Sequence, residues 1–300
     1  MGLLEHFYEH IKTGDLTVRN YKYRCEQIII TKLDEIPLNT VTTKKDYLIE
    51  RFIDAENHEA YSFRVKDEIL SMFPEHFNDS LTLINEMENL KTNAIVVIDS
   101  QSGKIFKILN HEEIVTSWDN YKKGLADRFK FLKGTAGSNA LKHLTDLEDK
   151  VIYEYDKLLD SLSMNPFYSI FFDKYLVSED IAEEEHSITY CSQLFPGKSF
   201  ALDCNRSYRK TKDELLHIEV AGSLPETFRV DDDIRKQYDE RFKPLIQFGF
   251  TEYNIEYSKL LWVDSVDRSL NKAEYSVREE VVDNVTIEVN LKVRKLKSVD

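Results

Sequence analysis

The sequence has few of the residues that interrupt or cross-link a chain, with 9 glycines, 6 prolines and 3 cysteines among 300 residues. Few glycines argue against a fold built on phosphate-binding loops, and few prolines argue against long linkers. Cys25, Cys191 and Cys204 are too few, and odd in number, for a disulfide framework. A reducing, cytoplasmic compartment therefore fits the cysteine content best.

Long apolar runs are also missing, since no stretch approaches the roughly 18 residues of a membrane-spanning helix. The first residues, MGLLEHFYEHIK, have neither the basic start nor the apolar core of a secretory signal, so we expect no export. Gly2 would suit N-myristoylation, but His6 stands where that motif requires serine or threonine. We therefore expect no membrane association.

Positive charge is in deficit, because 40 basic residues face 54 acidic ones and give a formal net charge of -14. A field of this sign repels phosphate backbones, so the composition disfavours nucleic acid as a partner. It disfavours an anionic membrane surface for the same reason. Such acidity fits either simple solubility or a basic protein partner.

Hydrophobic residues make up 42% of the chain and aromatic residues 12%, which is enough for a sizeable core. No linker is visible, so we predict a single integrated α+β domain over residues 1–300. Within it we expect mixed α/β structure in 1–110, helices in 111–178 and mainly antiparallel strands in 186–300.

The N-terminal part contains one long strand with a clear alternation of side chains. It runs from Val18 to Leu33, and one of its faces carries Tyr21, Tyr23, Cys25, Gln27 and Ile29. Residues 34–46 are predicted to be a loop, and 47–54 a partner strand or, alternatively, a helix. Residues 57–92 fit either a strand followed by a helix or two short helices around Pro74.

The clearest local pattern follows. An apolar run over 94–98 predicts a short strand, and Gly103 is placed to take the left-handed position of a hairpin loop. Asn110 can cap the helix that comes next. Apolar residues at helical spacing predict helices over 111–132 and 138–162, which would form a helical hairpin.

The aromatic-rich segment 167–176 is the most apolar of the chain, and we expect it to fill the core. Beyond it, alternating patterns predict strands and one helix that starts at Asp231 and ends at Ile246. The predicted strands cover 187–194, 199–208, 215–221, 253–263, 271–282 and 285–296. The fold class is therefore α+β, with antiparallel sheet from the N- and C-terminal parts packed against the central helical hairpin.

Two short patterns could carry chemistry. His6, Glu9 and His10 match the H-x-x-E-H pattern of inverted zinc peptidases, and on a helix the two histidines would share one face. Zinc hydrolysis also needs a third ligand and a cleft, which the sequence does not identify. The run Glu183–His186 places carboxylates beside an imidazole, and we interpret it as a solvated acidic loop.

Aromatic residues offer a different kind of site. Tyr21 and Tyr23 on the first long strand, and Tyr253 and Tyr257 near the end, could line a ligand cavity on a concave sheet. The alternative is that these tyrosines are ordinary core residues. No cofactor motif is present, and no G-x-S-x-G or other nucleophile signature appears.

Three segments resemble a family of uncharacterised bacterial proteins found mainly in Bacteroidota. They are DSQSGKI leading into NHEEIVTSWDNYKKGL, the segment NPFYSIFFDKYL, and the terminal AEYSVREEVVDNVTIEVNLKVRKL. The resemblance covers roughly residues 93–296 and implies no activity. The last segment is also similar in style to the curved sheets of lipoprotein-carrier-like folds. Those carriers are exported, so their function is not expected here.

We therefore expect a non-enzymatic, cytoplasmic protein that binds another protein, as an adaptor or an immunity-type partner in a bacterial secretion or toxin system. The alternative is a small-molecule or lipid-binding module that uses a concave, aromatic-lined sheet. A third possibility is a zinc-dependent hydrolase. A cavity of several hundred Å³ lined by tyrosines would favour the second of these.

Overall fold

A computed structural model describes residues 3–14, 16–53, 58–129, 134–178, 184–211 and 214–297. Its strands are β1 (Thr17–Leu33), β2 (Ile36–Ile53), β3 (Glu59–Phe73), β4 (Ile95–Ile98), β5 (Ile105–Ile108), β6 (Glu184–Cys191), β7 (Ser199–Lys210), β8 (Leu215–Ser223), β9 (Tyr253–Asp264), β10 (Leu270–Val281) and β11 (Val285–Leu296). Its α-helices are α1 (Leu3–Thr13), α2 (Asn78–Thr92), α3 (His111–Lys122), α4 (Leu125–Arg128), α5 (Thr135–Tyr153), α6 (Tyr155–Met164), α7 (Pro166–Phe171), α8 (Asp232–Arg241) and α9 (Lys243–Ile246).

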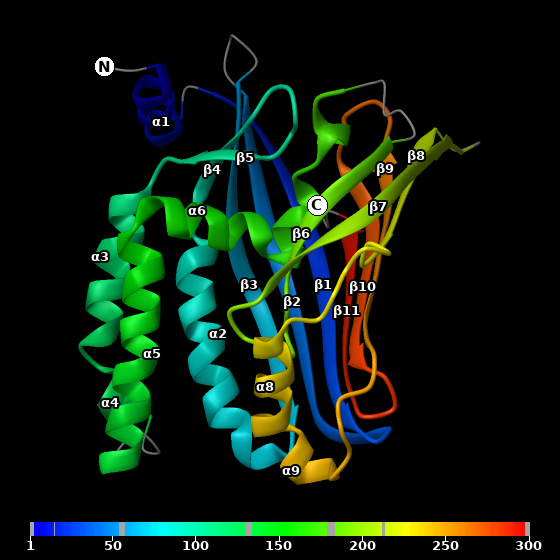
Figure 1. The fold of residues 1–300 in the computed structure, drawn as a ribbon. Coiled ribbons are helices and arrows are strands. Elements are labelled where there is room, and N and C mark those ends of the chain that lie inside the picture. Colours follow the sequence, from blue (N-terminus) through cyan, green and yellow to red (C-terminus); the bar gives the residue numbers. More distant parts are fainter. Residues whose placement is uncertain are drawn as a thin grey trace.

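All the described strands belong to one antiparallel sheet, in the order β5-β4-β3-β2-β1-β11-β10-β9-β8-β7-β6. The first and last long strands therefore pair at the centre, and each half of the chain builds outward to one edge (Figure 1). This confirms the expected α+β class with antiparallel sheet from both parts of the chain. None of the described helices has the length and apolar character that crossing a membrane would require.

The period-two pattern of the first strand is confirmed. Tyr23 and Cys25 are buried on the face that covers the core, while Lys22 and Ile28 on the opposite face are exposed. The loop predicted over 34–46 is wrong, because β2 already begins at Ile36 and pairs with β1 along its length. Asp34 and Glu35 have positive φ angles and make the tight turn between the two strands, which leaves no residues for a longer loop.

Residues 57–92 contain a strand followed by a helix, which is the first of the two predicted alternatives. β3 pairs with β2, and α2 packs on β3. Residues 54–57 lie outside the described part of the chain. Of the short hairpin that follows, β4 and β5 are confirmed, and Gly103 has the expected left-handed conformation with a φ of 69°.

Asn110 precedes α3 as predicted, but its side chain does not cap that helix. It accepts a hydrogen bond from the Ile95 N–H at 2.7 Å and donates one to the Asn93 carbonyl at 2.9 Å. These bonds hold the start of β4, and they occupy the amide that would otherwise reach the helix N-terminus.

The helical region departs from a simple hairpin. α3 contacts α5, but α5 ends at Tyr153 because Glu154 has an extended backbone with φ -90° and ψ 107°. After this break the chain changes direction, and α6 and α7 contact the strands. The packing of a central helical hairpin on the sheet is not confirmed.

The sheet curls so that α6 contacts both of its edge strands, β5 and β6 (Figure 1). On the β5 side, the Tyr155 hydroxyl accepts a hydrogen bond from the Ile108 N–H at 2.8 Å. On the β6 side, the Met164 sulfur lies 3.4 Å from the Cys191 sulfur. Helices α6 and α7 therefore close the open side of the curled sheet.

The C-terminal part follows the predicted pattern. In β11 the expected inward residues, Val285, Ile287, Val289, Leu291 and Val293, are all buried. Asp231 caps α8 by accepting a hydrogen bond from the Ile234 N–H at 2.8 Å. The predicted helix to Ile246 is divided into α8 and α9. One continuous core cluster includes residues from β1 to β11 together with the rings of α7, as expected for segment 167–176.

Candidate functional site

A cavity of about 530 Å³ lies between α6–α7 and the inner face of the curled sheet. Residues of β1, β6–β11, α6 and α7 line it, and the first residues of the β5 edge also reach it. Most of its floor is buried, whereas Met164 on α6 and Gln193 after β6 are exposed at its rim. The cavity is therefore open to solvent beside the edge strand β6.

One row of residues across the sheet makes the apolar floor. Strand register pairs Ile29 with Val289, Val289 with Val277, and Val277 with Tyr257. Because paired residues of adjacent strands point to the same face, these four side chains form a continuous strip across β1, β11, β10 and β9. All four line the cavity.

The same row continues into β8 and β7 through Gly222 and Cys204. A Cβ atom added to Gly222 would lie 2.4 Å from the Cys204 sulfur, so the glycine makes room for the buried thiol beside it. The row ends at His186 of β6, which also lines the cavity. The prediction of a solvated loop is therefore wrong for His186, because this residue belongs to β6 and its side chain faces the cavity.

The neighbouring row carries charge on the same face. It runs through Tyr275, Lys259, Val220 and Arg206, each of which pairs with the next on the neighbouring strand. All four residues line the cavity. The Lys259 and Arg206 side chains are only 8% and 9% exposed, so two largely buried cations lie in the cavity wall.

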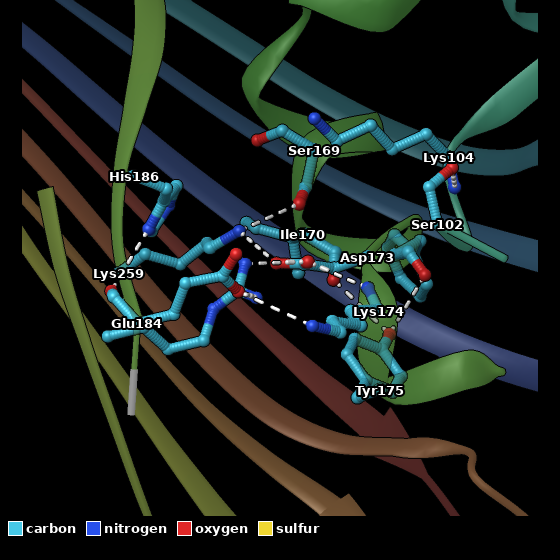
Figure 2. A network of polar contacts seen from close by, with 12 residues as sticks. Ser102, Lys104, Ser169, Ile170, Asp173, Lys174, Tyr175, Glu184, His186 and Lys259 are labelled. Carbon is cyan, nitrogen blue, oxygen red and sulfur yellow. Dashed lines mark hydrogen bonds and ion pairs between the residues drawn. The ribbon is translucent and has the colours of Figure 1, made fainter. Parts of the chain in front are cut away.

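Asp173 neutralises part of this charge. Its carboxylate lies 2.7 Å from the Lys259 ammonium and 2.9 Å from the Arg206 guanidinium. Figure 2 shows the Lys259 and Asp173 side chains pointing toward each other, with Ser169 and His186 beside them. Lys259 also donates to the Ser169 carbonyl at 3.3 Å, which ties the network to α7.

Burial would by itself raise the pKa of the Asp173 carboxyl, but Lys259 and Arg206 outweigh this effect and lower that pKa to about 2. Burial lowers the pKa of His186, which favours its neutral form. The charges of the cavity wall near neutral pH are therefore those of Asp173, Lys259 and Arg206, with Lys104 at the rim.

These cations keep unused hydrogen-bonding capacity. The Arg206 Nε is buried and has no hydrogen-bond partner. Its terminal nitrogens lie 2.9 Å from Asp173 and 3.7 Å from Glu184. Lys259 has three N–H donors, of which the described contacts use two. A buried donor without an acceptor costs about 1–3 kcal/mol, so an additional acceptor at this position would be stabilising.

The β4–β5 turn fixes Asp173 from the other side. A Cβ atom on Gly103 would lie only 2.2 Å from the Asp173 carbonyl oxygen. The glycine thus allows the turn to pack directly against the backbone of the residue that joins the two cations. Asp173 also caps the 3₁₀ turn Lys174–Leu176 by accepting a hydrogen bond from the Lys174 N–H at 2.7 Å.

A second polar cluster anchors the loop after β6. The fully buried Glu279 carboxylate accepts hydrogen bonds from the Tyr190 hydroxyl at 2.9 Å, the Tyr253 hydroxyl at 2.6 Å and the Gln193 N–H at 2.7 Å. Ser192 also donates to it. Burial and the nearby carboxylate both raise the pKa of the two tyrosines, so they stay protonated as donors. This cluster is an anchor for the loop and leaves the carboxylate fully occupied.

Of the four tyrosines predicted to line a ligand cavity, Tyr257 does so. The hydroxyl of Tyr23 donates to the Leu270 carbonyl at 2.8 Å, and that of Tyr253 donates to Glu279. Tyr21 packs at the edge of the core with the Lys295 ammonium 4.6 Å from its ring centre. The cavity instead receives three tyrosines that the sequence did not single out, Tyr168, Tyr190 and Tyr275.

The zinc pattern lies on α1, where His6 and His10 are one turn apart. The His6 side chain lies outside the described residues, and Glu9 pairs with Lys12 at 3.6 Å. Among the side chains that the structure describes, no group of three His, Cys, Asp or Glu is arranged to hold a metal ion. A zinc site at His6, Glu9 and His10 stays a prediction.

The polar residues of the cavity were missed, although the sequence contains a signal for two of them. Lys259 shares its parity with Tyr257 and Leu261, which places a lysine on the apolar face of a predicted strand. Arg206 occupies the equivalent place after Cys204 in β7. A charge on an inward face needs a partner, and only the fold shows that the partner is Asp173.

Comparisons with known proteins give little further information. No protein-family model matches the chain, and no curated protein matches it significantly. Among solved structures, one match is a structure titled for lipid–protein interactions in lipovitellin, with a TM-score of 0.44 and 11% sequence identity. The match covers 93% of this chain and 25% of the lipovitellin chain. A similarity of this size establishes neither a shared fold nor a shared ligand.

Proposed function

We propose that this chain binds a small, largely apolar molecule in the cavity between α6–α7 and the curled sheet. The observation that carries the proposal is the floor strip Ile29–Val289–Val277–Tyr257, an apolar surface that lines a cavity of about 530 Å³. Small-molecule sites typically have volumes of about 300–1,000 Å³, with mostly apolar walls and a few placed polar groups. This cavity has that size and an apolar floor, while its rim and the wall around Lys259 and Arg206 are polar.

The energetics favour an apolar occupant over solvent. Each methylene group transferred from water to such a wall contributes about 0.8 kcal/mol. The open rim beside β6 gives a route of entry, because Met164 and Gln193 there are exposed. The occupant would take the place that helix or strand side chains fill in a closed core.

The protein-binding role expected from the sequence, as an adaptor or immunity-type partner, stays a prediction. So do its basic partner and its cytoplasmic location. Binding of a small molecule and binding of a protein are compatible, but the cavity supports the first. A zinc-dependent hydrolase has no support from the described side chains beyond the helical spacing of His6 and His10.

A neutral apolar fluorophore, N-phenyl-1-naphthylamine, tests the proposal directly. We expect the purified chain to bind it with a stoichiometry of one and with enhanced fluorescence. Val277→Trp fills the middle of the floor and is expected to weaken binding at least about tenfold, since it removes most of the apolar contact.

Val266 is 81% exposed, so Val266→Trp is a matched control that should bind like the wild type. If Val277→Trp does not fold, Ile29→Trp tests the same strip at a less buried position. Failure of the wild type to bind the fluorophore would refute the proposal. Unchanged binding by a folded Val277→Trp or Ile29→Trp variant would refute its location.

A further inference from the structure

Binding of a neutral apolar molecule does not explain the charged row beside the apolar floor. Lys259 and Arg206 are both buried and both face the cavity, while Asp173 supplies one carboxylate between them. Two buried cations with one buried anion leave one positive charge in excess on this wall. A net buried charge is costly unless something pairs with it.

Nearby groups reduce this excess only in part. Glu184 is 3.7 Å from Arg206, but its side chain is 44% exposed and it also contacts Lys174 at 3.4 Å. An imidazole is either neutral or cationic, so His186 supplies no negative charge. Lys104 adds a further cation at the rim. Among the residues that line the cavity, the three cations Lys104, Arg206 and Lys259 accompany one carboxylate, that of Asp173.

The unused donors show which kind of group would complete the wall. Lys259 retains one N–H beyond those that Asp173 and Ser169 use, and the Arg206 Nε has no acceptor, although a ligand oxygen would reach this buried atom only after the guanidinium turns toward the cavity. Two donors with one excess positive charge match an acceptor that has two oxygens and a single negative charge. A carboxylate has these properties.

The position of the charged row fixes how such a ligand would lie. The floor from Ile29 to Tyr257 crosses four strands, or about 14 Å, and the charged row runs about 7 Å from it along the strands. Lys259, Val220 and Arg206 belong to β9, β8 and β7, at the end of the floor away from β1. The anionic group would lie at that end, and the apolar part would extend toward β1.

We propose that the ligand is a single-chain amphiphile with a carboxylate head, bound with the head at Arg206 and Lys259 and the chain along the floor strip. This inference rests on the proposed function, because it assigns the chemical class of the molecule in the same cavity. A phosphate head fits less well, since it brings a second charge and a third oxygen close to the Asp173 carboxylate.

Competition against N-phenyl-1-naphthylamine separates the two proposals. Dodecanoate, dodecanol and dodecyl phosphate carry the same chain with three different heads. We expect dodecanoate to displace the fluorophore at least about tenfold more tightly than dodecanol, which is the factor expected for a hydrogen bond to a charged group. Affinity for carboxylates should rise about fourfold for each added methylene until the floor is covered.

Arg206→Gln should remove most of the preference for dodecanoate while leaving the affinity for dodecanol within about twofold. Arg209→Gln is the matched control, because Arg209 lies on the same strand and is exposed, and it should keep the preference. Lys104→Gln, at the exposed rim, gives a second test that does not disturb the core, with an expected loss of about two- to threefold for dodecanoate alone.

The outcomes are distinct. Equal binding of dodecanoate and dodecanol would overturn the carboxylate assignment while the proposed function stands. Tighter binding of dodecyl phosphate than of dodecanoate would overturn it as well. Displacement by none of the three, with the fluorophore still bound, would exclude a single-chain amphiphile. If the fluorophore itself does not bind, the proposed function fails first.

Discussion

Asp173→Asn removes the negative charge that joins Lys259 to Arg206 and leaves the shape of the side chain almost unchanged. Asp173 is nearly fully buried, and its carboxyl pKa is lowered from 3.8 to about 2. One pKa unit corresponds to about 1.4 kcal/mol, so this carboxylate stabilises the folded chain by about 2.5 kcal/mol at neutral pH. Since the pKa is lower in the folded state, the contribution is complete above about pH 5 and is lost as the pH falls from 4 through 2.

Urea unfolding of the wild type and of Asp173→Asn between pH 7 and pH 3 measures this contribution. We expect the wild type to be about 2.5 kcal/mol more stable at pH 7 and only about half of that at pH 3, because protonated aspartic acid resembles asparagine. Asp203 is exposed on β7, so Asp203→Asn should change the free energy of unfolding by less than about 0.5 kcal/mol. A stability difference that does not change with pH would refute the assignment of the low pKa to this ion pair.

Two further predictions concern the groups around the cavity. Gly103→Ala should cost about 3 kcal/mol or more in urea unfolding, because its Cβ would lie 2.2 Å from the Asp173 carbonyl oxygen in addition to the positive φ. Gly197→Ala, with φ 80° and open space around it, should cost only about 1 kcal/mol, and an equal cost for both would contradict the close contact. Glu279→Gln should lower the free energy of unfolding by about 2 kcal/mol or more, because its amide turns a donor toward donors, whereas the exposed Glu219→Gln should be neutral in the same assay.

The strands were the most predictable part of the fold, for a local reason. A strand with one buried face has alternating apolar and polar residues, which are visible in the sequence. The bounds of β1 and β9–β11 were therefore predicted to within a few residues. The prediction of a loop over 34–46 was wrong because this part of β2 shows no apolar alternation. Its residues Thr40, Thr42 and Thr43 are polar and half-buried. Their strand structure depends on pairing with β1, which is a tertiary contact.

The helices show a second limit of prediction from sequence. Apolar spacing continues from α5 into α6, so the sequence predicts one helix where the chain turns at Glu154. The turn is stabilised by what α6 meets afterwards, the β5 edge at Tyr155 and the β6 edge at Met164. Helical periodicity reports which face is apolar, but not which element that face will contact. The cavity depends on this turn and was therefore not visible in the sequence.

The hairpin around Gly103 combines a feature that the sequence predicts with a contact that only the fold shows. Its turn is predictable from local chemistry, because a glycine there takes the left-handed conformation with a φ of 69°. Its second requirement is not local: the same missing side chain lets the turn pack on Asp173, which lies 70 residues further along the chain. Asp173 in turn holds Lys259 and Arg206 on the cavity wall. A glycine that a turn alone would explain is thus also the residue that sets how closely the β5 edge approaches the charged end of the cavity.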